Sequence, residues 1–267
     1  MIRSYFGIDK DPFAYDDLTL LPGQQEVVDT LRVHSQQGGL CLVLGAPGTG
    51  KTTIKEHLQK NADPKRALVV AIGRTLHTYP NILRLLCQAF QIEAKTSPFT
   101  GEKSLIEQAF SMNRQGKTLM TMIDDAHLLE MRTLRKLRLL FGDFPKNHNL
   151  ILVGQPALMH SLALQVNDNL RSRVTYSVIM KPLNPDDMEN FILSRLDDAG
   201  LGHNTFSAAA IDLIVRSAEG VPRAARNLCL SCMLKALRAQ KRVIDIDIVN
   251  RVLKQPHWRK NEDWEPF

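Results

Sequence analysis

The sequence lacks long apolar runs, a leader-like opening and a disulfide framework. No stretch approaches the roughly 18 apolar residues of a membrane span, and the opening MIRSYFGIDKDPF has no apolar core after its basic residue. Its few cysteines lie within apolar or helical patterns, so we expect free thiols. They are Cys41, Cys87, Cys229 and Cys232. These absences argue against secretion and membrane insertion and predict a cytoplasmic protein.

Aromatic residues are also scarce, at 6%, whereas hydrophobic residues make up 44% and charged residues 23% of the 267 residues. Such a mixture is typical of a folded globular chain of one or two domains. Acidic residues are outnumbered by basic ones, which gives a net charge of +6 and a pI near 9.2. This balance is a mild indication of a polyanionic partner such as nucleic acid.

Apolar runs alternate with helical patterns in the first two thirds of the chain. Strands are expected at 40–45, 68–73, 119–124, 150–155 and 175–180, and helices at 25–37, 52–61, 81–90, 103–114 and 132–141. Continuous apolar strands separated by helices predict a doubly wound parallel α/β sheet. From residue 185 onward only helices are expected, at 186–199, 207–218, 222–239 and 245–254, with Asn184, Ser207 and Asp245 as caps.

The segment GAPGTGKTT follows the first strand and precedes a helix, as a phosphate-binding P-loop must. Its glycines let backbone N–H groups face phosphates, Lys51 supplies a cation and Thr52 offers a hydroxyl to Mg²⁺. The predicted nucleotide contacts are Gly45, Ala46, Pro47, Gly48, Thr49, Gly50, Lys51, Thr52 and Thr53. The alternative is a glycine-rich turn that binds nothing.

Two carboxylates end the third strand in the segment LMTMIDDAH. Asp124 is expected to hold Mg²⁺ through water, and Asp125 to orient or deprotonate the attacking water. An Asp at the second position is one methylene shorter than the commoner Glu, which predicts slow hydrolysis. The alternative is that both residues simply end the strand. His127, beside this pair, is interpreted as a packing or polar-network residue.

Polar residues farther along the chain are candidates for contacting the γ-phosphate. Gln155 ends the fourth strand, where it could sense the γ-phosphate or simply begin a turn before Pro156. Arg171 or Arg173 could stabilise the charge of the transition state, as could Arg223 in the helical region. For each arginine, an ordinary exposed surface position is the alternative.

Three other patterns each have a functional and a simpler structural interpretation. Cys229 and Cys232 have metal-site spacing but no second ligand pair, so we predict that they pack inside the helical region. The 132–138 helix carries a basic face that is either solvated or suited to phosphates. Phosphate contacts are also expected in the turn after the second strand, unless it is an ordinary polar loop. Its candidate DNA-binding residues are Arg74, Thr75 and His77.

The ordered segments GAPGTGKTT, IDDAH, VGQP, LRSRV and GVPR, with the opening SYFGIDKDPF, resemble the AAA+ ATPases of the ExeA, TniB and TnsC group. The resemblance implies a P-loop AAA+ core followed by a small all-helical lid, with ATP and Mg²⁺ as cofactors. It implies an adenine-side segment at 1–39, the core at 40–182, the lid at 183–255 and a tail at 256–267. It also implies Lys51, Asp125, Gln155 and an Arg173 finger as catalytic residues, Thr52 and Asp124 as metal ligands, and Arg223 as a second sensor.

Two functions fit that group. One is a regulator of transposition that oligomerises with ATP on double-stranded DNA, selects the target and recruits or activates a transposase. The other is an ATPase that assists assembly of a secretion apparatus. Because secretion members usually continue into a membrane segment that this sequence does not show, and because the charge is basic, the sequence favours the first.

Overall fold

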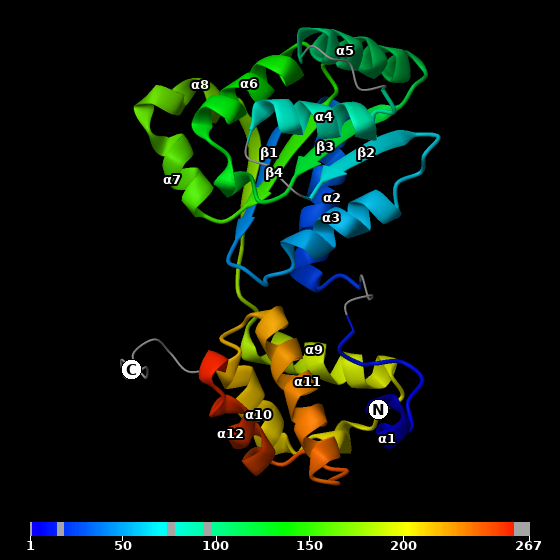
Figure 1. The fold of residues 1–267 in the computed structure, drawn as a ribbon, viewed down its shortest axis with the longest axis vertical. Helices are drawn as coiled ribbons and strands as arrows, with labels where there is room; N and C mark the ends of the chain where they lie inside the picture. The colour runs from blue at the N-terminus through cyan, green and yellow to red at the C-terminus, as the bar shows by residue number, and fades with distance from the viewer. Residues whose placement is uncertain (1, 15–18, 74–77, 93–97, 259–267) are drawn as a thin grey trace. The chain divides into compact units, whose positions relative to one another are not determined.

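The computed structural model describes residues 2–14, 19–73, 78–92 and 98–258. The chain forms two compact units, which are described separately (Figure 1). One unit is Leu18–Met180, and the other combines Met1–Asp17 with Lys181–Phe267.

A parallel five-stranded sheet forms the centre of the 18–180 unit, in the order β2-β3-β4-β1-β5. Its strands are β1 (Gly39–Gly45), β2 (Ala67–Ile72), β3 (Thr118–Ile123), β4 (Asn149–Gly154) and β5 (Val174–Met180). The five predicted strands are confirmed to within a residue or so at each end. Because the strands are parallel, the segments that leave their carboxyl ends all emerge at one edge of the sheet.

Helices cover both faces of this sheet, as a doubly wound fold requires (Figure 1). Alternate β1 residues supply the two cores: Leu42 packs on the side of α4, α5, α6 and α7, and Val43 on the side of α2 and α3. These helices are α2 (Pro22–Gln37), α3 (Lys51–Lys60), α4 (Tyr79–Ala89), α5 (Pro98–Arg114), α6 (Met131–Gly142) and α7 (Ala157–Ala163). The predicted fold class is confirmed, although α7 and the short α8 (Asp168–Arg171) were not expected from the sequence.

The second unit is helical where the structure describes it. It contains α1 (Ile2–Phe6), α9 (Pro185–Asp198), α10 (Ala208–Ser217), α11 (Pro222–Arg238) and α12 (Ile246–Leu253). The three predicted caps are confirmed: the side chains of Asn184, Ser207 and Asp245 each accept a backbone N–H from the first turn of the helix that follows.

The amino-terminal helix α1 belongs to this helical unit. The Arg242 guanidinium lies 4.8 Å from the centre of the Tyr5 ring and donates a hydrogen bond to the Tyr5 carbonyl. A cation held against an aromatic face in this way stabilises the contact. In the structure α1 groups with the helical unit and α2 with the sheet, and an adenine-side role for residues 1–39 stays a prediction.

Cys229 and Cys232 are fully buried free thiols on α11. Burial raises the pKa of the Cys232 thiol to about 12 and that of Cys229 well above its usual value. Within the described residues, no group of three or more His, Cys, Asp or Glu side chains could hold a metal ion. The burial of both thiols confirms the prediction that this cysteine pair packs inside the helical region.

Candidate functional site

The glycine-rich loop joins β1 to α3 in a tight turn. Gly48 and Gly50 have φ angles of 87° and 91°, a backbone conformation that residues with a Cβ rarely adopt. The Thr49 hydroxyl donates to the Ala46 backbone carbonyl at 2.9 Å, and this hydrogen bond within the loop stabilises the turn. The loop therefore has the backbone that a phosphate cradle needs, at the amino end of a ten-residue helix.

Lys51 is the first residue of α3, and its side chain turns back over the loop. Its ammonium donates to the carbonyls of Gly45 at 2.9 Å and Ala46 at 2.8 Å. These contacts keep a positive charge at the mouth of the loop, where phosphate oxygens would be received. The geometry thus fits a polyphosphate at the predicted residues 45–53.

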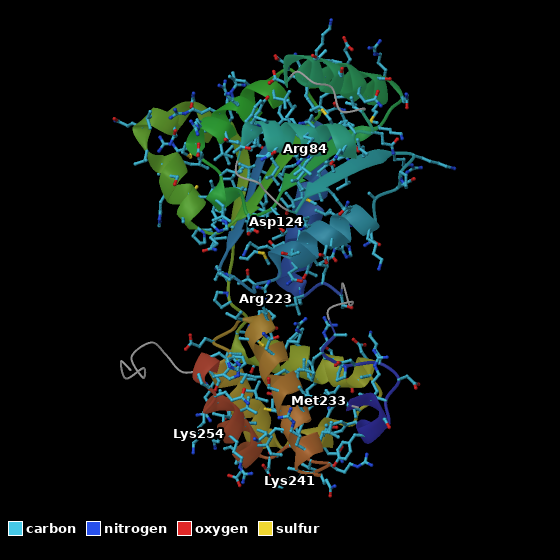
Figure 2. All side chains as sticks on the ribbon, in the orientation of Figure 1. Arg84, Asp124, Arg223, Met233, Lys241 and Lys254 are labelled. Atoms are coloured by element: carbon cyan, nitrogen blue, oxygen red, sulfur yellow. The ribbon has the colours of Figure 1, made fainter. Side chains whose placement is uncertain are left out.

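Asp124 follows β3 at the same sheet edge (Figure 2) and is 7% exposed. Its Oδ2 accepts from the Thr52 hydroxyl at 3.5 Å, and its Oδ1 accepts from the Asp125 backbone N–H at 3.0 Å. A hydroxyl and a carboxylate brought together from two elements are the hard oxygen donors that Mg²⁺ prefers. The residues present therefore fit the implied metal.

Asp125 is exposed beside Asp124 and has a φ of 52°. Asp adopts this left-handed conformation more readily than most residues, so the strand can turn sharply here. The turn leads into the short helix η1 (Ala126–Leu128), in which His127 is half-buried. A Cβ added at Gly154 would lie 3.2 Å from the His127 backbone nitrogen, so this residue packs over the end of β4.

Gln155 directly follows β4, which lies between β3 and β1 in the sheet. Its backbone therefore emerges between the carboxylate pair and the glycine-rich loop, where the sequence predicted a γ-phosphate sensor. The side chain is half-buried, and the Gln155 backbone carbonyl accepts the Leu158 N–H at the start of α7.

Arg173 lies at the opposite edge of the sheet from the glycine-rich loop. It directly precedes β5, which runs parallel to β1 with Val174 paired to Leu40 and Met180 paired to Gly45. At about 3.3 Å per residue, this strand separates Arg173 from the loop by about 20 Å. Arg173 is exposed, whereas Arg171 forms an ion pair with Asp168 at 2.9 Å.

Arg223 is an exposed residue in the first turn of α11, within the helical unit (Figure 2). The turn before it contains Gly220 at a φ of 75°, where an added Cβ would lie 2.6 Å from the Leu183 carbonyl oxygen. Only glycine therefore fits the turn that begins this helix.

The predicted DNA-binding residues Arg74, Thr75 and His77 lie outside the described residues, in the connection between β2 and α4. The second basic candidate, α6, has two cations that contact other elements of the fold. Arg135 donates to the Val166 carbonyl at 3.1 Å and to Asn167 Oδ1 at 2.6 Å. Lys136 lies 5.3 Å from the centre of the Tyr79 ring. Arg132 and Lys136 are exposed, so the basic face of this helix stays a prediction.

Sequence reasoning missed two residues at this site. Gln24 on α2 is buried, accepts the Leu21 N–H and donates to the Thr49 carbonyl at 3.3 Å, which fixes the loop against a neighbouring helix. Lys55 on α3 forms an ion pair with Asp124 Oδ2 at 2.8 Å. The spacing of four residues from Lys51, which places both side chains on one helix face, was an available signal for Lys55.

The parallel sheet, the glycine-rich loop and the carboxylates beside it define a P-loop fold, which the predicted ATPase class requires. Residues 33–162 match the family model of the AAA domain. Over 265 residues the chain is 26% identical to General secretion pathway protein A of Aeromonas hydrophila, covering 93% of this chain and 47% of that protein. It is also 26% identical to the Holliday junction branch migration complex subunit RuvB of Protochlamydia amoebophila, covering 91% of this chain and 69% of that protein.

A solved structure shares the fold. The Aeropyrum pernix ORC1 protein in complex with DNA matches with a TM-score of 0.68 at 15% identity, covering 90% of this chain and 67% of that one. The chain spans about half the length of the secretion-pathway relative. These comparisons agree with the predicted AAA+ class and with a likeness to the secretion branch. The described residues contain no helix with the length and hydropathy of a membrane span.

Proposed function

We propose that this chain binds ATP at the glycine-rich loop and hydrolyses it slowly. Lys51 would neutralise the β- and γ-phosphates, and Thr52 with Asp124 would hold Mg²⁺, which supplies charge neutralisation on the phosphate oxygens. Asp125 would orient the attacking water, and Gln155 would contact the γ-phosphate. Arg223 of the lid would act as a second sensor. The exposed, shorter Asp125 side chain is the physical reason for slow turnover.

The position of Arg173 supports a further proposal, that the protein acts as an oligomer. Because Arg173 lies at the opposite sheet edge from the loop of its own 18–180 unit, a finger role requires that it reach the nucleotide of a neighbouring subunit. A surface that gives an arginine and a different surface that receives it form a head-to-tail contact, which builds rings or helical filaments. We therefore propose an oligomer with nucleotide at its interfaces.

For the oligomer's target we propose double-stranded DNA, with a role in regulating transposition. The net charge of +6 suits a polyanion. The fold is shared with a protein solved in complex with DNA, and a relative belongs to a Holliday junction complex. Arg74, Thr75 and His77 are the proposed contacts, and the partner would be a transposase or targeting protein.

The second candidate function is assistance in assembling a secretion apparatus. It is favoured by the likeness to General secretion pathway protein A, which extends over nearly the whole of this chain. Both functions would use the same nucleotide site and the same oligomer, so they differ only in what the assembled protein binds.

Duplex binding at several salt concentrations separates the two functions. The wild type should bind DNA with ATP and weakly with ADP or no nucleotide, because nucleotide-clamped subunits act on one duplex together. If each subunit contacts about two phosphates, it contributes about −1.8 to the slope of log affinity against log salt.

Variants complete the experiment. Arg74→Ala should lower the DNA affinity while ATP binding is kept, and Lys51→Ala should abolish both ATP binding and the nucleotide dependence. DNA binding that ignores nucleotide, or none at low salt, would contradict the DNA function and favour the secretion candidate. Undiminished ATP binding by Lys51→Ala would contradict the nucleotide site itself.

A further inference from the structure

Lys55 forms a buried ion pair with the carboxylate that the nucleotide site would use for Mg²⁺. Its Nζ lies 2.8 Å from Asp124 Oδ2, and the two side chains are only 10% and 9% exposed. Lysine is rarely buried without a partner, because removing its charge from water is unfavourable. The pair is therefore a fixed part of the site, unlike an ordinary surface contact.

The chain's own donors already surround Asp124. Oδ2 accepts from both Lys55 and the Thr52 hydroxyl, and Oδ1 accepts from the backbone N–H of Asp125. The Lys55 ammonium is also enclosed at the end of β2, where a Cβ added at Gly73 would lie 3.3 Å from Nζ. The Lys55 ammonium is thus held beside the proposed metal ligand.

Lys51 and Lys55 lie one helical turn apart on α3 but serve different groups. Lys51 donates to the loop carbonyls of Gly45 and Ala46, which places its charge on the phosphate side. Lys55 faces the carboxylate instead. The helix therefore brings one cation to the phosphates and a second to the acid that would otherwise repel them.

We propose that Lys55 is a tethered counter-ion that makes nucleotide binding nearly independent of Mg²⁺. This inference rests on the proposed nucleotide site and deepens it. Lys55 neutralises Asp124, so polyphosphate enters without meeting an uncompensated carboxylate. A divalent ion arriving at Thr52 and Asp124 competes with the ammonium for the same oxygen and is repelled by it, so Mg²⁺ adds little affinity.

The test compares affinities for a fluorescent ADP analogue in excess EDTA and in saturating Mg²⁺. The measured quantity is the dissociation constant in EDTA divided by the dissociation constant in Mg²⁺. This ratio is insensitive to a general change in affinity. For the wild type the ratio should stay within a few-fold of one. Lys55→Met, which keeps the length of the side chain but removes the charge, should raise it at least about tenfold.

Three further variants make the result specific. Lys55→Gln keeps a hydrogen-bond donor without charge, so it should resemble Lys55→Met. Lys60→Met changes an exposed lysine on the same helix and should leave the ratio at the wild-type value. The double variant Lys55→Met with Asp124→Asn leaves no buried charge at the pair, and its ratio should return toward one even if the single variant folds poorly.

The outcomes distinguish this inference from the proposed function. ADP binding with the same ratio in wild type and Lys55→Met would overturn the role of Lys55 and leave the nucleotide site standing. A wild-type ratio of about a hundred or more would overturn it as well. If the wild type binds no ADP in either condition, both the inference and the nucleotide site are wrong.

Discussion

At the scale of single residues, the site depends on close contacts between segments distant in the sequence. Gly50 shows this best, because an added Cβ would lie 2.0 Å from Gln24 Nε2, and its φ of 91° already disfavours other residues. The P-loop pattern predicts a glycine at this position. The buried Gln24 that packs against it comes from a helix that the sequence presents only as an amphipathic stretch before the first strand.

His148 gives a residue-scale prediction about pH. Its imidazole is buried, stacks on Phe141 at 4.7 Å and hydrogen-bonds to Thr121 at 2.9 Å, and burial lowers its pKa to about 3. Below about pH 6.5 the imidazole binds a proton in the unfolded chain but not in the folded chain. The free energy of unfolding is therefore highest above pH 6.5 and falls as the pH decreases toward 3.

The expected contribution of His148 is a loss of about 2 kcal/mol between pH 7 and pH 5. Urea unfolding of wild type and His148→Asn at both pH values measures it, and the variant should lose correspondingly less stability. The exposed His160 supplies the control, His160→Asn, which should keep the wild-type pH dependence. Parallel behaviour of wild type and His148→Asn would contradict the prediction.

At the scale of elements, the structure shows that part of the basic face of α6 is used within the fold. Helix α6 presents Leu134, Leu137 and Leu140 to the core, as its spacing predicts. Its Arg135, however, meets a partner that no local pattern indicates, Asn167 of the short helix η2 (Gln165–Asn167). The sequence alone could not distinguish a solvated face from a phosphate-binding face, because the spacing of charges does not tell which cation contacts another element.

The α6 contact to η2 predicts different costs for neighbouring arginines. Arg135→Ala would leave the 1% exposed Asn167 without the donor to its Oδ1, which should lower the free energy of unfolding by about 1–3 kcal/mol. Arg132→Ala removes only an exposed pair with Glu130 and should change it by less than about 0.5 kcal/mol. Urea denaturation measures the free energy of unfolding of both variants. Equal losses would show that the Arg135 contact to Asn167 does not stabilise the fold.

At the scale of the whole molecule, the parallel sheet separates the two halves of the proposed catalytic machinery. The glycine-rich loop, Asp124 and Gln155 leave the carboxyl ends of the strands, whereas Arg173 leads into an amino end. This separation follows from strand direction alone. It makes the oligomer, and not the single chain, the proposed unit of catalysis.

Mixing two inactive variants tests donation between subunits. Arg173→Ala lacks the proposed finger and Asp125→Asn lacks the proposed catalytic carboxylate, so each alone should hydrolyse ATP very slowly. In a random equal mixture, about one quarter of head-to-tail interfaces combine an intact Arg173 with an intact Asp125, and about that fraction of wild-type activity should return. ATP turnover measures it. No recovery in an assembly shown to contain both variants would argue against donation between subunits.

The sequence by itself determined the alternation of strands and helices, the glycine-rich loop and the helix caps, because these depend on local periodicity, backbone freedom and hydrogen bonds between near neighbours. It also predicted burial of the cysteine pair from helical spacing. Only the tertiary structure decided that α1 groups with the helical unit, that Gln24 holds the loop and that Lys55 forms an ion pair with Asp124. Each of these joins residues far apart in the chain, and their partners are chosen by packing, which no local pattern encodes.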